Sequence, residues 1–120
     1  MSDKVNIAEK LALFTDTWSP KIVGEVDDFA VKLAKLHGEF VWHQHDNEDE
    51  MFLVISGQLT MQFRDRKVIV NPGEFIIVPK GVEHNPLAQQ ETHIVLFERN
   101  TIAHTGNVVS ERTVREFQRL

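Results

Sequence analysis

The sequence contains no cysteine among its 120 residues. Disulfide bonds and thiolate metal sites are therefore excluded, and nothing in the chain points to an oxidising compartment. No apolar run is long enough to span a bilayer, and a net charge of −5 provides no basic surface for nucleic acid. The first residues, MSDKVNIAEKLALF, lack the basic start and long apolar centre of a signal peptide. We therefore expect a cytoplasmic protein that binds neither membranes nor nucleic acids.

The chain also lacks the short motifs of several enzyme classes. It has no glycine-rich phosphate loop and no nucleophile motif, which disfavours phosphoryl transfer and serine-hydrolase chemistry. It has no repeat of fixed period, and its 42% apolar and 26% charged residues are typical of an ordinary globular domain. A chain of this length can bury one core, so we expect a single domain over residues 1–120.

Short apolar runs separated by turn residues dominate the sequence from residue 21 onward. Phe29, Val31 and Leu33 alternate with smaller or polar residues, the pattern of a half-buried strand. The sequence NPGE at residues 71–74 has proline and glycine where a type II turn requires them. Short strands at this spacing indicate an all-β sandwich or barrel. The predicted strands are Lys21–Val26, Phe29–Leu36, Phe40–His45, Met51–Ile55, Leu59–Arg64, Lys67–Val70, Phe75–Val78 and Thr92–Glu98.

Both ends of the chain are expected to carry a short helix. Ile7, Leu11 and Phe14 recur at helical spacing near the N-terminus. Near the C-terminus, Ser110 is a candidate cap for a helix over Glu111–Leu120. The alternative for this second segment is a mobile terminus.

Three histidines and a glutamate are candidate metal ligands. His43 and His45 are separated by one residue, so their side chains share a face if residues 40–45 form a strand. Glu50 follows an acidic turn and would open the next strand, and His84 follows a second turn-rich stretch. Three imidazoles and one carboxylate suit a borderline divalent metal: zinc, iron, nickel, cobalt or manganese. The alternative is a set of polar residues in surface loops.

The spacing of these residues resembles that of the cupin superfamily. Its first motif, G-x5-H-x-H-x3,4-E-x6-G, is matched from Gly38 to Gly57, with one residue fewer before the first histidine. Its second motif, G-x5-P-x-G-x2-H-x3-N, is matched from Gly73 to His84, with Ala88 in place of the asparagine. The local sequence is most similar to small single-domain bacterial cupins, of the cupin 2 conserved-barrel or mannose-6-phosphate-isomerase-like type.

This resemblance implies both a fold and a site. The fold would be a double-stranded β-helix, or jelly-roll barrel, with its core at about residues 29–98. Residues 1–20 and 99–120 would then pack on the barrel or on a partner chain. One divalent metal per chain is expected, with two positions open if the metal is octahedral and none if it is tetrahedral zinc. The residues that match the family's metal ligands are His43, His45, Glu50 and His84.

Three functions are compatible with such a site. The first is a metal-binding cupin that takes a small polar organic ligand, either a sugar or a carboxylic acid. The second is an enzyme: an Fe(II) dioxygenase, or an isomerase whose metal polarises a carbonyl while His93 or Glu48 moves the proton. The third is an accessory or sensing barrel whose metal only stiffens the fold. For His93, the one candidate catalytic histidine, a hydrogen-bonded strand residue is the favoured alternative.

The outer face of the barrel is expected to be apolar. Trp42 would lie on the face opposite His43, together with Met51, Leu53 and Ile55. A patch of that size is usually covered by another element or by a partner chain. We therefore expect a homodimer, and the resemblance to cupins points the same way.

Overall fold

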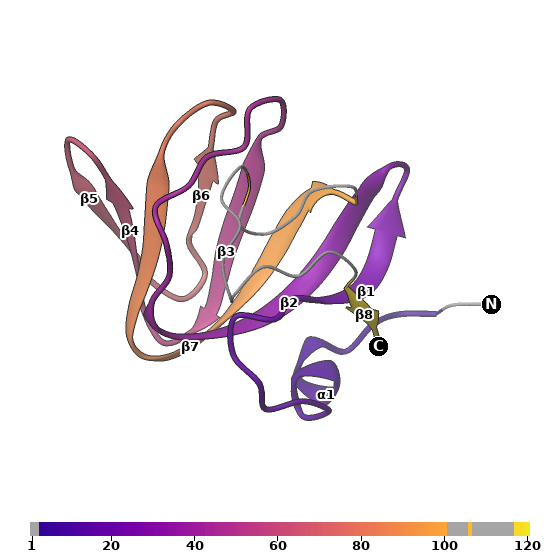
Figure 1. Ribbon diagram of the computed structural model, residues 1–120. Coiled ribbons are helices and arrows are strands. Elements are labelled where there is room, and N and C mark those ends of the chain that lie inside the picture. Colours follow the sequence, from indigo (N-terminus) through magenta and orange to yellow (C-terminus); the bar gives the residue numbers. More distant parts are fainter. Residues whose placement is uncertain (1–2, 101–105, 107–116) are drawn as a thin grey trace.

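The computed structural model describes residues 3–100, Gly106 and residues 117–120. Within these residues one short helix precedes eight strands (Figure 1). No helix in this part of the chain has the length and apolar character needed to cross a membrane. The elements are α1 Ile7–Leu11, β1 Lys21–Val26, β2 Phe29–Glu39, β3 Glu50–Ser56, β4 Leu59–Phe63, β5 Lys67–Val70, β6 Phe75–Val78, β7 His84–Arg99 and β8 Gln118–Arg119.

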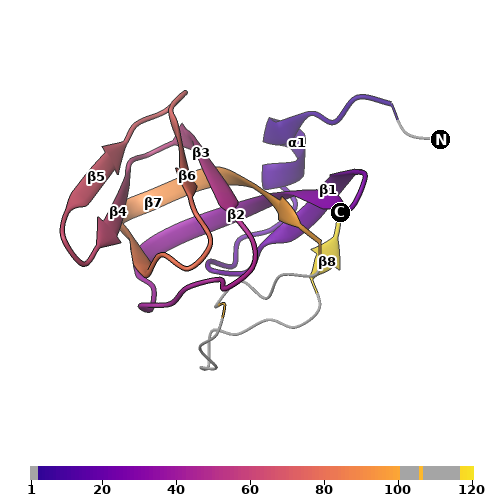
Figure 2. The same ribbon diagram turned by 90° about the horizontal axis from the view of Figure 1, so that it is seen from above.

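The long strand β7 organises the sheet. It pairs antiparallel with β2 over most of its length, and Figure 2 shows these two strands side by side through the molecule. The first part of β7 also pairs with β4, and the second part pairs with β3. Strands β5 and β6 extend the sheet from β4 and β3, whereas β1 and β8 extend it from β2. The predicted all-β jelly-roll fold is confirmed.

The main core, called the interior cluster here, lies inside this folded sheet. Strand β2, which forms one side of this core, differs from the half-buried strand that was predicted. Ala30, Lys32 and Ala34 lie on the inner face and are at most 1% exposed, while Leu33 is buried on the other face. Both faces of β2 are thus covered. The buried members of the interior cluster are Trp18, Ala34, Leu36, Phe40, Phe52, Val54, Leu59, Met61, Phe63, Val70, Val78, Ala88, Ile94 and Leu96.

The N-terminal segment covers part of the outer face of the sheet. Leu11 and Phe14, which were predicted to share a helix face, are buried against Leu33 in a second group called the outer cluster. Leu53 and Ile55 pack against the same cluster. The chain itself therefore covers part of the apolar surface that suggested a partner.

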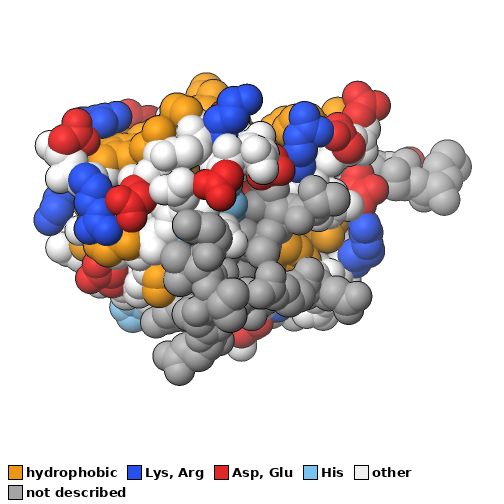
Figure 3. Space-filling model, turned by 45° about the horizontal axis from the view of Figure 1, so that its top comes forward, with side chains coloured by type: hydrophobic (Ala, Val, Ile, Leu, Met, Phe, Trp, Pro, Cys, Tyr) orange, Lys and Arg blue, Asp and Glu red, His pale blue; other side chains and the backbone are white. Residues whose placement is uncertain are grey.

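A strip of the outer face stays apolar and exposed on β6. Phe75 and Ile77 are 60% and 53% exposed, and they stand opposite Leu53 and Met51 in the β3–β6 register. On the face shown in Figure 3, apolar side chains likewise interrupt the charged ones. The homodimer predicted from the face of Trp42, Met51, Leu53 and Ile55 stays a prediction.

Two predicted elements do not adopt the predicted secondary structure. Residues 40–45 form no strand, because β2 ends at Glu39 and the following segment meets β7 only at an isolated bridge between His43 and His84. At the C-terminus, Gln118–Arg119 forms strand β8 against β1, where the predicted helix would have ended. The rest of that predicted helix lies outside the described residues.

The predicted turns form as expected. Gly73 adopts a positive φ of 83°, and the Glu74 N–H donates to the carbonyl of Asn71 at 2.9 Å, as in a type II turn. The Asp65-Arg66 tip joins β4 to β5. These turns fix the spacing between the strands that carry the candidate ligands.

Gly57 is the glycine at which a side chain would meet both a strained backbone and a neighbouring strand. Its φ is +88°, and an added Cβ would lie 2.5 Å from Thr92 Oγ1 and 2.8 Å from the carbonyl oxygen of Glu91. We expect Gly57→Ala to lower the free energy of unfolding by about 2 kcal/mol, because strain and a clash with backbone add. Chemical denaturation measures this change. Gly24→Ala is the control, since a Cβ at Gly24 would meet no atom within 4 Å; an equal loss in both variants would contradict the prediction.

Candidate metal centre

A backbone bridge brings His43 and His84 together. The His43 N–H donates to the His84 carbonyl at 3.0 Å, and the His84 N–H donates to the His43 carbonyl at 2.9 Å. Directly paired residues of antiparallel segments project their side chains to the same side. The two imidazole centroids accordingly lie 4.3 Å apart. His84 opens β7, so the bridge fixes one imidazole on the longest strand of the sheet.

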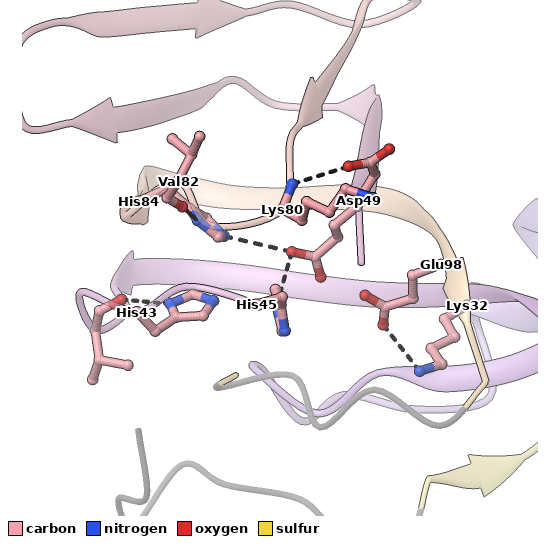
Figure 4. Close-up of polar contacts among 10 residues, drawn as sticks. Lys32, His43, His45, Asp49, Lys80, Val82, His84 and Glu98 are labelled. Carbon is pink, nitrogen blue, oxygen red and sulfur yellow. Dashed lines mark hydrogen bonds and ion pairs between the residues drawn. The ribbon is translucent and has the colours of Figure 1, made fainter. Parts of the chain in front are cut away.

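His45 and Glu50 complete the group from the adjoining turn and strand. Glu50 begins β3 and is buried on the same strand face as Phe52. Its Oε1 lies 3.3 Å from His45 Nε2 and 3.5 Å from His84 Nε2 (Figure 4). The ligand atoms of the four residues lie within 4.8 Å of one another, and all four side chains are at most 5% exposed. The prediction that these residues meet is therefore realised in the fold, without the strand at residues 40–45.

Two of the histidines are held in a single tautomer. The Nδ1 of His43 lies 2.9 Å from the carbonyl of Val41, and the Nδ1 of His84 lies 2.9 Å from the carbonyl of Val82. A carbonyl only accepts, so both Nδ1 atoms carry the proton. Each neutral ring then presents an unprotonated Nε2, which is the form that binds a metal.

The centre of the group contains polar atoms that lack a hydrogen-bond partner. They are His45 Nε2, Glu50 Oε1 and His84 Nε2. Buried polar atoms of this kind are rare in folded proteins. In particular, the lone pair of His84 Nε2 faces a carboxylate oxygen with no proton between them. A divalent cation would satisfy these donors, and nitrogen and carboxylate ligands together suit a transition metal.

Burial sets the protonation of the group. It lowers the pKa of His43 to about 4, with repulsion from His84 adding to the effect. Burial opposes the ionisation of Glu50, but polar contacts with Glu98, His45 and His84 hold the pKa of Glu50 well below its usual range. A neutral imidazole and an ionised carboxylate are the forms that metal binding requires.

Sequence reasoning missed two charged residues beside this group. Lys32 Nζ lies 2.9 Å from Glu98 Oε1, and both side chains are fully buried (Figure 4). Burial raises the pKa of Glu98 well above its usual range, and the nearby charge of Glu50 raises it further against the opposing effect of Lys32. The protonated form of Glu98 is thereby favoured, and in that form its hydroxyl would donate a hydrogen bond to Glu50. The interior thus contains one cation and one anion that balance each other.

The other candidate site residues lie elsewhere. The Nε2 of His93 lies 2.7 Å from Glu91 Oε2, and His93 shares its strand face with Val95 of the outer cluster. The inner face of β7 carries the alternate residues, such as Ile94 of the interior cluster. Among the described residues, the group of converging ligand atoms includes Glu50 and not Glu48.

The lowered pKa of His43 predicts a pH dependence of stability in the metal-free protein. The unfolded protein binds a proton at His43 below about pH 6.5, whereas the folded protein does so only near its pKa of about 4. The free energy of unfolding is therefore higher by about 3 kcal/mol above pH 6.5, and this difference disappears as the pH falls to 4. Denaturant titrations of chelated protein across this range measure the loss. His43→Gln should show a smaller loss, and an unchanged dependence in that variant would refute the assignment.

The fold is a jelly roll, and its interior holds three histidines and a glutamate. Together they define this chain as a barrel protein with a candidate metal centre. The chain belongs to the cupin domain family, Cupin_2, which matches residues 30–108. The resemblance inferred from the motif spacing is thereby confirmed. Trp18, which packs in the interior cluster, comes from outside the matched range.

Individual proteins are also similar to this chain. The chain is 36% identical over 63 residues to "Uncharacterized protein YdbB" of Bacillus subtilis (strain 168), a match that covers 52% of this chain and 56% of that protein. The chain thus spans about half the length of this curated relative. Among solved structures, a cupin-2 domain containing protein from Shewanella frigidimarina is 43% identical with a TM-score of 0.79, covering 79% of this chain and 93% of that one. Protein NMB1881 from Neisseria meningitidis is 30% identical with a TM-score of 0.75, covering 81% and 99%.

Proposed function

We propose that this cupin binds one divalent transition metal and holds a small organic ligand beside it. His43, His45, Glu50 and His84 would be the protein ligands of the metal. The observation that carries the proposal is the buried pair of unprotonated His84 Nε2 and Glu50 Oε1, 3.5 Å apart, which lack a hydrogen-bond partner. Such an arrangement is unfavourable without a cation and favourable with one.

The residues of the chain orient and shield this site. The carbonyls of Val41 and Val82 fix the rings of His43 and His84, and such outer partners hold metal-binding histidines in the productive orientation. Burial of the group excludes bulk water from it. The metal, when bound, would act as a Lewis acid towards an oxygen atom of the ligand.

Elemental analysis tests the proposal directly. The protein is purified without added metal and without a metal-binding affinity tag, and its metal content is measured. One ion per chain is the expected result, either as purified or after incubation with zinc, iron, nickel, cobalt or manganese. Absence of stoichiometric metal after every incubation would refute the proposal.

The identity of the metal then separates a binding role from an enzymatic one. Iron would direct the next assay to oxygen uptake with candidate organic substrates, whereas zinc, nickel or manganese would direct it to isomerisation and ligand binding. His93, the candidate proton carrier, pairs with Glu91 on the outer face. Thermal stability that is unchanged by chelation would count against a metal that only stiffens the fold.

A further inference from the structure

A small cavity lies inside the barrel next to the candidate metal group. His43 and Glu50 form part of its wall, and its free space is about 30 Å³. Every other residue that lines it is apolar. Its apolar lining includes Trp18, Ala34, Phe40, Ile94 and Leu96.

Apart from the ligand atoms of the candidate metal group, the polar side-chain atoms of the wall are already engaged. The indole N–H of Trp18 donates to the carbonyl of His37 at 2.9 Å, so the ring presents only carbon atoms to the cavity. The Nδ1–H of His43 donates to the carbonyl of Val41. A hydroxyl group on the body of a ligand would lose its water and find no partner, which is unfavourable. A sugar is therefore a poor fit for this cavity.

The charge of the group favours an anionic head on the ligand. A divalent cation would bring two positive charges, and the three imidazoles are neutral ligands. Glu50 supplies the one carboxylate of the converging group, because Glu98 lies outside that group and against Lys32. A carboxylate on the ligand would offset positive charge that Glu50 alone leaves uncompensated in this buried site.

The volume of the cavity limits the length of the ligand. One water molecule needs about 10–15 Å³ on this measure, so 30 Å³ accommodates a chain of two or three atoms. Trp18 forms part of the cavity wall, with its ring stacked on Phe40 at a centroid distance of 4.6 Å and an angle of 12°. Its backbone has a positive φ of 57°, and its N–H donates to the carbonyl of Lys35 at 2.8 Å. A non-glycine residue held in this conformation indicates a wall that the surrounding structure keeps in place.

We propose that the ligand is a short monocarboxylic acid with an unsubstituted alkyl chain of about three carbons, and that Trp18 sets this length. The proposal rests on the proposed metal-binding function. It replaces the sugar among the expected ligands with an acid whose carboxylate reaches the metal and whose alkyl chain fills the apolar cavity.

Binding of three acids to the cobalt-loaded protein tests the proposal. The visible absorption of Co(II) is followed while butyrate, 3-hydroxypropionate or hexanoate is added. Butyrate and 3-hydroxypropionate have the same number of non-hydrogen atoms, but the second ends in a hydroxyl. We expect 3-hydroxypropionate and hexanoate to bind at least about tenfold more weakly than butyrate, a difference of about 1.4 kcal/mol each.

Variants test the role of Trp18. Trp18→Ala should bind hexanoate at least as tightly as butyrate, whereas Phe75→Ala, which removes an exposed aromatic ring on β6, should keep the wild-type order. Ala34→Val provides a second test that retains the Trp18 wall. The added methyl groups enter the cavity, so this variant should lose butyrate binding and still bind acetate.

The outcomes distinguish this inference from the proposed function. Failure of the wild-type protein to bind cobalt would remove the metal site and this inference with it. Cobalt binding without any spectral response to butyrate, or with equal affinity for 3-hydroxypropionate, would overturn the inference alone. Tight binding of hexanoate to the wild type, or an unchanged order of affinities in both Trp18→Ala and Ala34→Val, would overturn the role of the wall.

Discussion

Replacement of His84 by alanine should abolish stoichiometric metal binding. His84 contributes a fully buried imidazole whose Nε2 faces Glu50 Oε1 and whose Nδ1–H is held by the carbonyl of Val82. Loss of an outer partner of a ligand typically weakens metal binding by about 10- to 100-fold, and loss of the ligand itself should exceed this. Metal content after reloading and dialysis is the measurement. The same result is expected for His43→Ala.

Two further variants make this test specific. His84→Gln keeps most of the volume of the side chain, so it separates loss of the ligand from the cavity that alanine leaves in a packed interior. His93→Ala is the matched control, because this histidine lies on the other face of β7 and pairs with Glu91. We expect no metal in His84→Gln and a wild-type content in His93→Ala. Metal retained at the wild-type level by the His84 variants would refute the ligand assignment.

The spacing of the motifs was enough to predict the ligand set because short turns determine it. The turns at Gly57, Gly73 and Gly81 have positive φ values of 88°, 83° and 78°, the conformation that glycine adopts most readily. Strands bounded by such turns were predicted to the residue, as at Lys67–Val70 and Phe75–Val78. The turn lengths then determine which residues lie opposite one another.

Prediction failed where long-range pairing decides the conformation. β7 begins at His84, eight residues before the predicted start at Thr92, although the sequence NPLAQQE shows no regular alternation of apolar residues. Pairing with β4 on one side extends this strand, and that partner is distant in sequence. Conversely, residues 40–45 resemble a strand in sequence, but the structure gives them one bridge and no continuous partner.

The buried charges were missed for a related reason. Lys32 alternates with apolar residues, and alternation alone predicts that a lysine faces water. The lysine is buried because Glu98, 66 residues later in the chain, lies diagonally across from it on β7, and no local pattern reveals this pairing. Buried lysine and glutamate residues are rare unless they are paired. The sequence did contain one signal of the buried pair: Lys32 and Glu98 are isolated charges within otherwise apolar strands.

Replacement of Lys32 by methionine should be among the most destabilising single changes in the interior. Lys32 Nζ lies 2.9 Å from Glu98 Oε1 and 3.8 Å from the centroid of the Phe117 ring. Without the lysine, Glu50 and Glu98 would share one proton and leave a buried negative charge without compensation. Breaking a buried pair typically costs about 3–5 kcal/mol. We expect a loss of about 3 kcal/mol in the free energy of unfolding, because the proton on Glu98 limits the buried charge. Denaturant titration of metal-free protein at neutral pH provides the measurement.

Glu98→Gln distinguishes this account from a simple ion pair. A glutamine amide can accept from Lys32 through its oxygen and donate to Glu50 through its nitrogen, as a protonated Glu98 does. The change should therefore alter stability by less than about 1 kcal/mol, within the usual range when the pattern of hydrogen bonds is kept. Lys67→Met, at an exposed position on β5, is the control for loss of a lysine charge. If Glu98 were ionised in the folded protein, Glu98→Gln would destabilise it as much as Lys32→Met does. Equal losses in these two variants would therefore show that the proton is not on Glu98.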